Sequence, residues 1–118
     1  MIAVIDYGLG NILAFRNVFS RLNVPVTVAR SAQDLAQATK LVLPGVGSFD
    51  QAMKQFDDSG MRGEVERLVL QRGMPILGVC VGMQMLAGAS DEGELPGLGW
   101  IDGRVRKFDP SRMVRAMP

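Results

Sequence analysis

The strongest chemical signal in the chain is a single cysteine placed between two glycines. The segment Gly78-Val79-Cys80-Val81-Gly82 follows a short apolar stretch and precedes a helical pattern. This arrangement predicts a nucleophile elbow, a sharp strand-to-helix turn that presents a reactive atom at the edge of a sheet. Partial positive charge at a helix N-terminus favours the thiolate, and the Val81 N–H is placed to stabilise an oxyanion. A buried structural cysteine is the alternative, at about even odds for this pattern alone.

A second glycine-rich segment, Pro44-Gly45-Val46-Gly47, follows another predicted strand. Glycine lets backbone amides approach a ligand closely, so an N–H group from this loop is a candidate to complete an oxyanion hole. A tight strand-to-helix connection explains the same residues, and on the loop alone it is favoured by about two to one.

A third loop, at residues 6 to 11, also contains paired glycines. Gly8 and Gly10 resemble the start of a dinucleotide-binding fingerprint, but the position of the third glycine holds Leu13. A turn followed by an Asn11 cap is therefore the preferred interpretation. Gln84, one turn beyond Cys80, is placed to reach a substrate, although an isolated glutamine is more often solvated.

The elements that position these loops alternate between short apolar strands and amphipathic helices. Strands are predicted at 1–6, 24–29, 41–43 and 76–79, and Asn11, Ser31 and Ser48 are predicted to begin helices. Further helices are predicted at 63–72 and after Cys80, and Asp102-Gly103 predicts a C-terminal β-hairpin. The pattern indicates an α/β fold with a mainly parallel sheet flanked by helices on both faces. Ligands bind such sheets at the carboxyl ends of the strands, where loops 7–11, 44–48 and 78–82 lie.

Composition narrows the class of protein further. The 118 residues are 47% apolar and carry a net charge of +1, which suits one globular domain without general attraction to nucleic acid or an anionic membrane. No apolar run approaches the roughly 20 residues of a membrane span, and the N-terminus begins as a strand rather than as a signal peptide. The single cysteine excludes an internal disulfide. These features predict a cytoplasmic protein, with no metal and no cofactor expected.

The three loops together resemble the class I, triad-type glutamine amidotransferases, and in particular the glutaminase subunits of imidazole glycerol phosphate synthases. The matching segments are 5–11, 43–49, 77–84 and 97–101. The resemblance implies a flavodoxin-like sheet in which Cys80 attacks the side-chain amide of glutamine.

The same resemblance implies three further groups of site residues. Backbone N–H groups of an oxyanion hole would come from Val46, Gly47 and Val81. Contacts with bound glutamine would come from Gly45, Gln84 and Glu92. A loop near a partner subunit would contain Tyr7, Gly8, Gly10 and Asn11.

The partner that the resemblance implies is a (β/α)8-barrel synthase subunit in a heterodimer. Ammonia passes to it through a shielded tunnel, because ammonia in neutral water is mostly protonated and no longer nucleophilic. The barrel then makes imidazole glycerol phosphate and an aminoimidazole ribotide in histidine biosynthesis. Similar subunits serve surface-polysaccharide amidation, and another elbow-cysteine hydrolase is a further alternative.

The chain departs from this family in one respect. Family members are longer, and near the C-terminus they have a histidine and a glutamate that complete a Cys-His-Glu triad, whereas this chain contains no histidine. General-base activation of the thiol is therefore incomplete within these residues. We expect residues 1–118 to be one amidotransferase domain, truncated before its C-terminal part and inactive alone; a catalytically dead binding module is the alternative.

Overall fold

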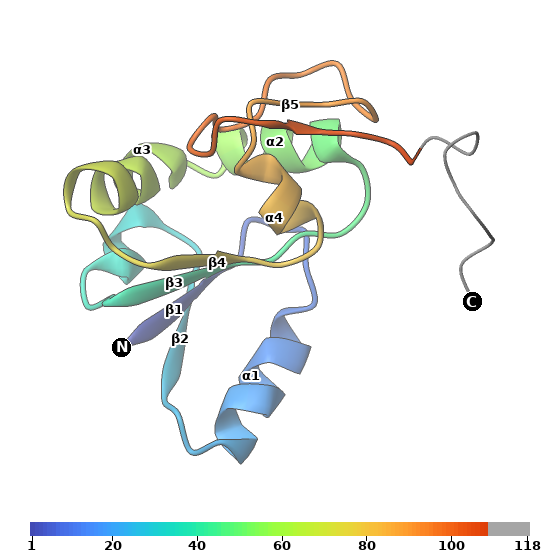
Figure 1. The fold of residues 1–118 in the computed structure, drawn as a ribbon. Helices are drawn as coiled ribbons and strands as arrows, with labels where there is room; N and C mark the ends of the chain where they lie inside the picture. The colour runs from blue at the N-terminus through green and yellow to red at the C-terminus, as the bar shows by residue number, and fades with distance from the viewer. Residues whose placement is uncertain (109–118) are drawn as a thin grey trace.

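In the computed structural model, which describes residues 1–108, a parallel sheet is flanked by helices and accompanied by a small ribbon (Figure 1). The strands of the sheet are β1 (Ile2–Ile5), β2 (Val26–Ala29), β3 (Lys40–Leu43) and β4 (Ile76–Gly78). They pair in the order β2-β1-β3-β4, and every pairing is parallel. This is the strand order with which flavodoxin-like sheets begin, so the predicted fold class is confirmed.

Burial explains why these short segments form strands. Ala3, Val4 and Ile5 are fully buried in β1, as expected for a parallel strand that is covered by neighbouring elements. Val4 pairs with Val28 of β2 and Val42 of β3. Because β1, β3 and β4 are adjacent and parallel, the loops that follow them emerge at one edge of the sheet, as the sequence predicted.

The helical elements differ in length and regularity. They are α1 (Ile12–Arg21), the 3-10 turn η1 (Ala32–Leu35), α2 (Phe49–Asp58), α3 (Arg62–Glu66), the π-helical turn η2 (Arg67–Gln71) and α4 (Val81–Met85). Both caps predicted for the longer helices are present. The Ala14 N–H donates to Asn11 Oδ1 at 3.2 Å, and the Gln51 N–H donates to Ser48 Oγ at 3.1 Å.

The two faces of the sheet are covered unequally. Helices α2, α3 and α4 lie on one face, whereas α1 lies alone on the other (Figure 1). Phe49, Met53 and Phe56 of α2 are buried, but α1 has no buried residue, and Leu22 at its end is 63% exposed. Helices therefore lie on both faces, as predicted, but within the part of the chain described α1 covers the second face only in part.

The predicted C-terminal hairpin is wrong. Instead, β5 (Ala89–Ser90) and β6 (Arg104–Val105) pair in parallel. The intervening chain packs on α4, because the N–H groups of Leu98, Gly99 and Ile101 donate to the carbonyls of residues 85, 87 and 86. The last carbonyls of a helix have no partner within it. Here they accept hydrogen bonds from residues 98–101, and the hairpin that residues 102–103 predict does not form.

Only one 3-10 turn, η1, follows Ser31, so the prediction of an amphipathic helix there is also wrong. Ser31 makes no side-chain cap to η1, and the Asp34 carboxylate instead accepts the Arg30 N–H at 3.0 Å. That hydrogen bond, with smaller contributions from Ser31, holds the pKa of Asp34 below its usual value. Leu35 and Ala38 are buried by this short connection, which brings the chain directly into β3.

Candidate active site

Cys80 lies at the turn between β4 and α4. Its backbone has φ 57° and ψ −125°, and its side chain is exposed. A positive φ is strained for a residue with a side chain and persists only where its surroundings enforce it. This geometry confirms the predicted elbow, and the exposed thiol excludes the buried structural cysteine.

The glycines on either side of Cys80 are sterically required. A Cβ atom on Gly78 would lie 2.6 Å from the Met83 Cα atom, and one on Gly82 would collide with the Leu43 carbonyl oxygen. Both neighbours are backbone atoms, which cannot move aside as a flexible side chain can. The strand, the turn and the first turn of α4 therefore pack at backbone distance.

The loop 44–48 lies against the start of α4. A Cβ atom on Gly45 would lie 2.7 Å from the Gly82 backbone nitrogen and 2.8 Å from the Tyr7 hydroxyl. Gly45 is buried, whereas Val46 is 49% exposed and Gly47, with φ +85°, is exposed. The structure thus brings the two glycine-rich loops together and leaves residues 46 and 47 open to solvent beside the elbow.

The first turn of α4 leaves one backbone donor near the thiol. The N–H groups of residues 82 to 84 donate to the carbonyls of Val79 and Cys80 at 3.0–3.3 Å. The Val81 N–H has no acceptor among residues 1–108. A donor left free at a helix start is suited to stabilising an oxyanion.

Tyr7 is the residue whose position the sequence did not reveal. Its hydroxyl donates to the Pro44 carbonyl at 2.7 Å and lies 3.4 Å from Met85 Sδ, and its ring packs edge-on against Phe56. Burial raises the pKa of Tyr7 to about 12, so the hydroxyl remains a donor. The Tyr7 side chain points inward and supports the loop at Pro44, while contact of its loop with a partner stays a prediction.

The rest of the loop 7–11 lies beside the same proline. A Cβ atom on Gly10, which has φ +138°, would lie 3.0 Å from the Pro44 side chain. Gly8 and Asn11 are exposed. Contact of this loop with a partner remains a prediction.

The two polar residues predicted to contact a substrate lie on different elements. Gln84 is half-buried on α4, one turn beyond Cys80, and Glu92 is exposed in the loop that follows β5. Asp50 is a further residue of this region, which the sequence did not single out: its carboxylate binds this loop to α2. Its only signal was an acidic residue in the first turn of a helix, which usually indicates favourable interaction with the helix dipole.

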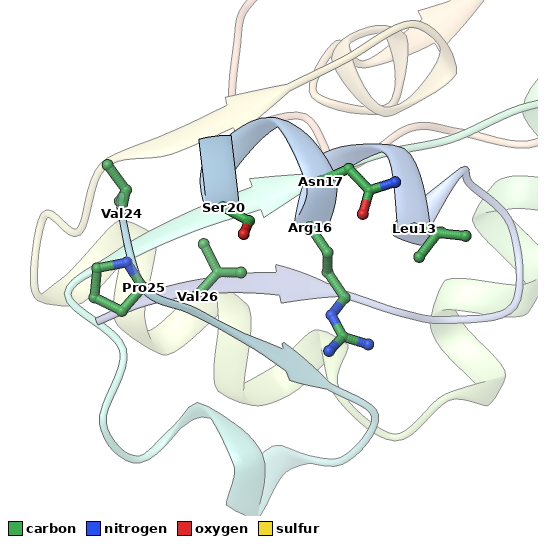
Figure 2. Close-up of a pocket in the computed structure, with 7 residues that line it drawn as sticks. All are labelled: Leu13, Arg16, Asn17, Ser20, Val24, Pro25 and Val26. Carbon is green, nitrogen blue, oxygen red and sulfur yellow. The ribbon is translucent and has the colours of Figure 1, made fainter. Parts of the chain in front are cut away.

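A hollow of about 370 Å³ lies between α1 and the segment that enters β2, and shares no residue with the loops around Cys80 (Figure 2). Its walls are formed by Leu13, Arg16, Asn17, Ser20, Val24, Pro25 and Val26. Across residues 1–108, no group of three or more His, Cys, Asp or Glu side chains is arranged to hold a metal ion. No helix in that range has the length and apolar character needed to cross a membrane.

Comparison with known proteins places this chain in a family. The family described as "CobB/CobQ-like glutamine amidotransferase domain" matches residues 5–117. The imidazole glycerol phosphate synthase subunit HisH of Bdellovibrio bacteriovorus is 62% identical over 108 residues, which are 92% of this chain and 53% of that protein. HisH of Leptospira interrogans is 47% identical over 120 residues, covering 100% of this chain and 59% of that protein. The chain thus spans between 53% and 59% of the length of these relatives.

A solved structure described as "Crystal structure of glutamine amidotransferase" supports the fold. It superposes with a TM-score of 0.75 at 24% identity, over 96% of this chain and 59% of that one. The fold, the elbow and the family match agree. The chain therefore belongs to the CobB/CobQ-like family of glutamine amidotransferase domains.

Proposed function

We propose that this chain supplies the nucleophile of a glutaminase. The Cys80 sulfur bonds to the side-chain amide carbon of glutamine, the C–N bond breaks, and the nitrogen leaves as ammonia after taking a proton. Water then cleaves the thioester to glutamate and returns the thiol. The observation that carries the proposal is the exposed thiol of Cys80 at a strained turn, φ 57°, beside the loop 44–48.

In this proposal the backbone around Cys80 stabilises the oxyanion. The donors are the N–H groups of Val46, Gly47 and Val81, which belong to the two segments that pack together at Gly45 and Gly82. Preorganised backbone donors at such a position contribute strongly to catalysis, because they need no reorganisation during the reaction. Contacts with the rest of glutamine come from Gly45, Gln84 and Glu92.

The partner that we propose is a (β/α)8-barrel synthase subunit that receives the ammonia. This is supported by the relatives whose name is imidazole glycerol phosphate synthase subunit HisH, and it assigns the heterodimer to histidine biosynthesis. The exposed loop residues Gly8 and Asn11 are the proposed contact region. A free, reactive thiol suits the reducing cytoplasm.

A second candidate function is a binding module without catalysis. The observation in its favour is that the 118 residues contain no histidine, so the chain has no imidazole to act as base and acid. We propose that residues 1–118 belong to a single amidotransferase domain, of which the chain spans 53% to 59% of the length of the HisH relatives.

Alkylation of Cys80 by a diazo-ketone analogue of glutamine, followed by mass spectrometry, tests the proposal. We expect slow, saturable labelling that excess glutamine suppresses, because the proposed contacts with glutamine would hold the analogue beside the thiol. Iodoacetamide serves as the matched reagent that needs no pocket. Labelling by iodoacetamide without saturable labelling by the analogue would contradict a glutamine site.

A further inference from the structure

Asp50 links two segments that are far apart in the sequence. It lies in the first turn of α2, two residues after the Ser48 cap at which the loop 44–48 ends. Its carboxylate accepts the Glu94 N–H, at 3.0 Å to Oδ1 and 2.9 Å to Oδ2. The same Oδ1 atom accepts the Leu95 N–H at 2.9 Å.

The other amides of this loop are bonded as well. The Asp91 N–H donates to the Val105 carbonyl at 2.8 Å, the Glu92 N–H to Ser90 Oγ at 3.1 Å, and the Gly93 N–H to the Ser90 carbonyl at 3.3 Å. All five backbone donors from 91 to 95 are therefore used within the chain. The loop offers a ligand its side chains rather than its amides, and Glu92 is exposed on it.

The fit between the loop and α2 depends on Gly93. A Cβ atom there would collide with Asp50 Oδ1 and would lie 3.0 Å from the Phe49 ring. The missing side chain at 93 allows the loop to approach the carboxylate closely. The close approach at Gly93 and the hydrogen bonds of Glu94 and Leu95 therefore both involve the Asp50 carboxylate.

We propose that Asp50 is a positioning residue for glutamine binding, an inference that rests on the proposed function. It holds loop 91–95 on the N-terminus of α2, and so fixes Glu92 relative to the loop 44–48 that enters the same helix. Without this contact, the loop populates other conformations, and the ligand must first select the competent one. A reduced competent fraction weakens the apparent affinity and leaves the chemistry of the bound state unchanged.

A competing explanation for Asp50 at this position is its charge alone, because an acidic residue in the first turn stabilises a helix through the helix dipole. Asp50→Asn separates the two roles. Its amide oxygen can still accept both N–H groups that now reach Oδ1, while the negative charge is lost. Asp50→Ala removes acceptor and charge together, and Gly93→Ala displaces the loop without altering α2.

The test uses the complete chain with these three variants and with Asp58→Ala, an exposed aspartate near the other end of α2, as the matched control. The first measurement is amide hydrogen exchange at Glu94 and Leu95. We expect exchange to accelerate about tenfold in Asp50→Ala and Gly93→Ala, as for net loss of one hydrogen bond. Asp50→Asn and Asp58→Ala should exchange close to the rate of the unmodified chain.

The second measurement is the diazo-ketone concentration that half-saturates labelling of Cys80. This concentration should rise about tenfold in Asp50→Ala and Gly93→Ala, because the fraction of chains with the loop in its competent conformation falls by the same factor. The limiting rate of labelling should be unchanged. The double variant Asp50→Ala/Gly93→Ala should have the same half-saturating concentration as either single variant, because both substitutions remove the same contact. Unchanged exchange in Asp50→Ala would contradict the proposed contact between Asp50 and loop 91–95. Exchange in Asp50→Asn as fast as in Asp50→Ala would also contradict it.

Faster exchange with unchanged half-saturation would overturn the role in glutamine binding. If the unmodified chain shows no saturable labelling, the proposed function fails and the role in glutamine binding fails with it. In that case accelerated exchange in Asp50→Ala still identifies the structural contact, so the two failures are distinguishable.

Discussion

Cys80 shows how a reactive residue is held by neighbours that have no side chain. Its backbone strain, of the order of 1–3 kcal/mol, is maintained by close packing at Gly78 and Gly82. We expect Gly82→Ala to abolish saturable labelling of Cys80 and to lower the free energy of unfolding, because the new methyl group collides with the Leu43 carbonyl. Gly63→Ala is the control, since its Cβ atom meets nothing within 4 Å in α3, and it should stabilise the helix by up to about 1 kcal/mol. Equal labelling of Gly82→Ala and the unmodified chain would contradict the elbow.

Tyr7 connects the chain after β1 to the loop beside the thiol. Tyr7→Phe removes the donor to the Pro44 carbonyl, and we expect it to lower the free energy of unfolding by about 1–2 kcal/mol, measured by urea denaturation.

Burial raises the pKa of Tyr7 from 10.0 to about 12, so its neutral form is favoured in the fold. The resulting stabilisation is complete below pH 10 and is lost as the pH rises towards 12. Tyr7→Phe should lack this loss, and the same alkaline dependence in both chains would contradict it.

At the scale of elements, the two capped helices differ in what their caps support. Ser48 caps α2, which is buried against the sheet, whereas Asn11 caps α1, which buries no residue. We expect Ser48→Ala to lower the global free energy of unfolding by about 1 kcal/mol. Asn11→Ala should mainly increase hydrogen exchange in α1, because that helix contributes little to the core. Equal losses of global stability in the two variants would contradict this difference in packing.

The elements themselves were predictable where local signals and burial agreed. Continuous apolar runs located all the strands of the parallel sheet, and a serine or an asparagine marked the starts of α2 and α1. The signals failed at residues 102–103, where a strong turn sequence was overruled by the carbonyls at the end of α4. They failed again after Ser31, where Asp34 bonds the Arg30 N–H and only one helical turn forms.

At the scale of the whole molecule, the sheet face beside α1 is apolar and only partly covered. Two hollows of about 270 Å³ each lie there, both lined by Phe19 and Leu77, and Leu77 is 58% exposed on the edge strand β4. We expect the chain to self-associate, because exposed apolar patches and open strand edges promote pairing. Sedimentation at several concentrations should show association that Leu77→Lys reduces and Ile101→Lys, a distant exposed position, does not. A concentration-independent monomer would contradict this.

Catalysis also belongs to the scale of the whole molecule. We expect the 118-residue chain to hydrolyse glutamine no faster than its Cys80→Ala variant, because it contains no histidine to return a proton to the departing ammonia. General acid–base help of this kind contributes about 10²- to 10⁴-fold. Ammonia release, measured with and without a barrel subunit, checks this. A Cys80-dependent rate would mean that another group serves as base, and Asp6 is already paired with Arg30 at 3.1 Å.

The sequence by itself determined the parallel sheet, the elbow at Cys80 and the three loops at one edge. These depend on apolar runs, glycine sterics and caps, all of which act over a few residues. Only the tertiary structure decided that Tyr7 points inward to Pro44 and that Asp50 binds amides 44 and 45 residues away. It also decided that β5 and β6 run parallel. Such contacts depend on which backbone groups remain unpaired after the elements pack, and no local pattern records that.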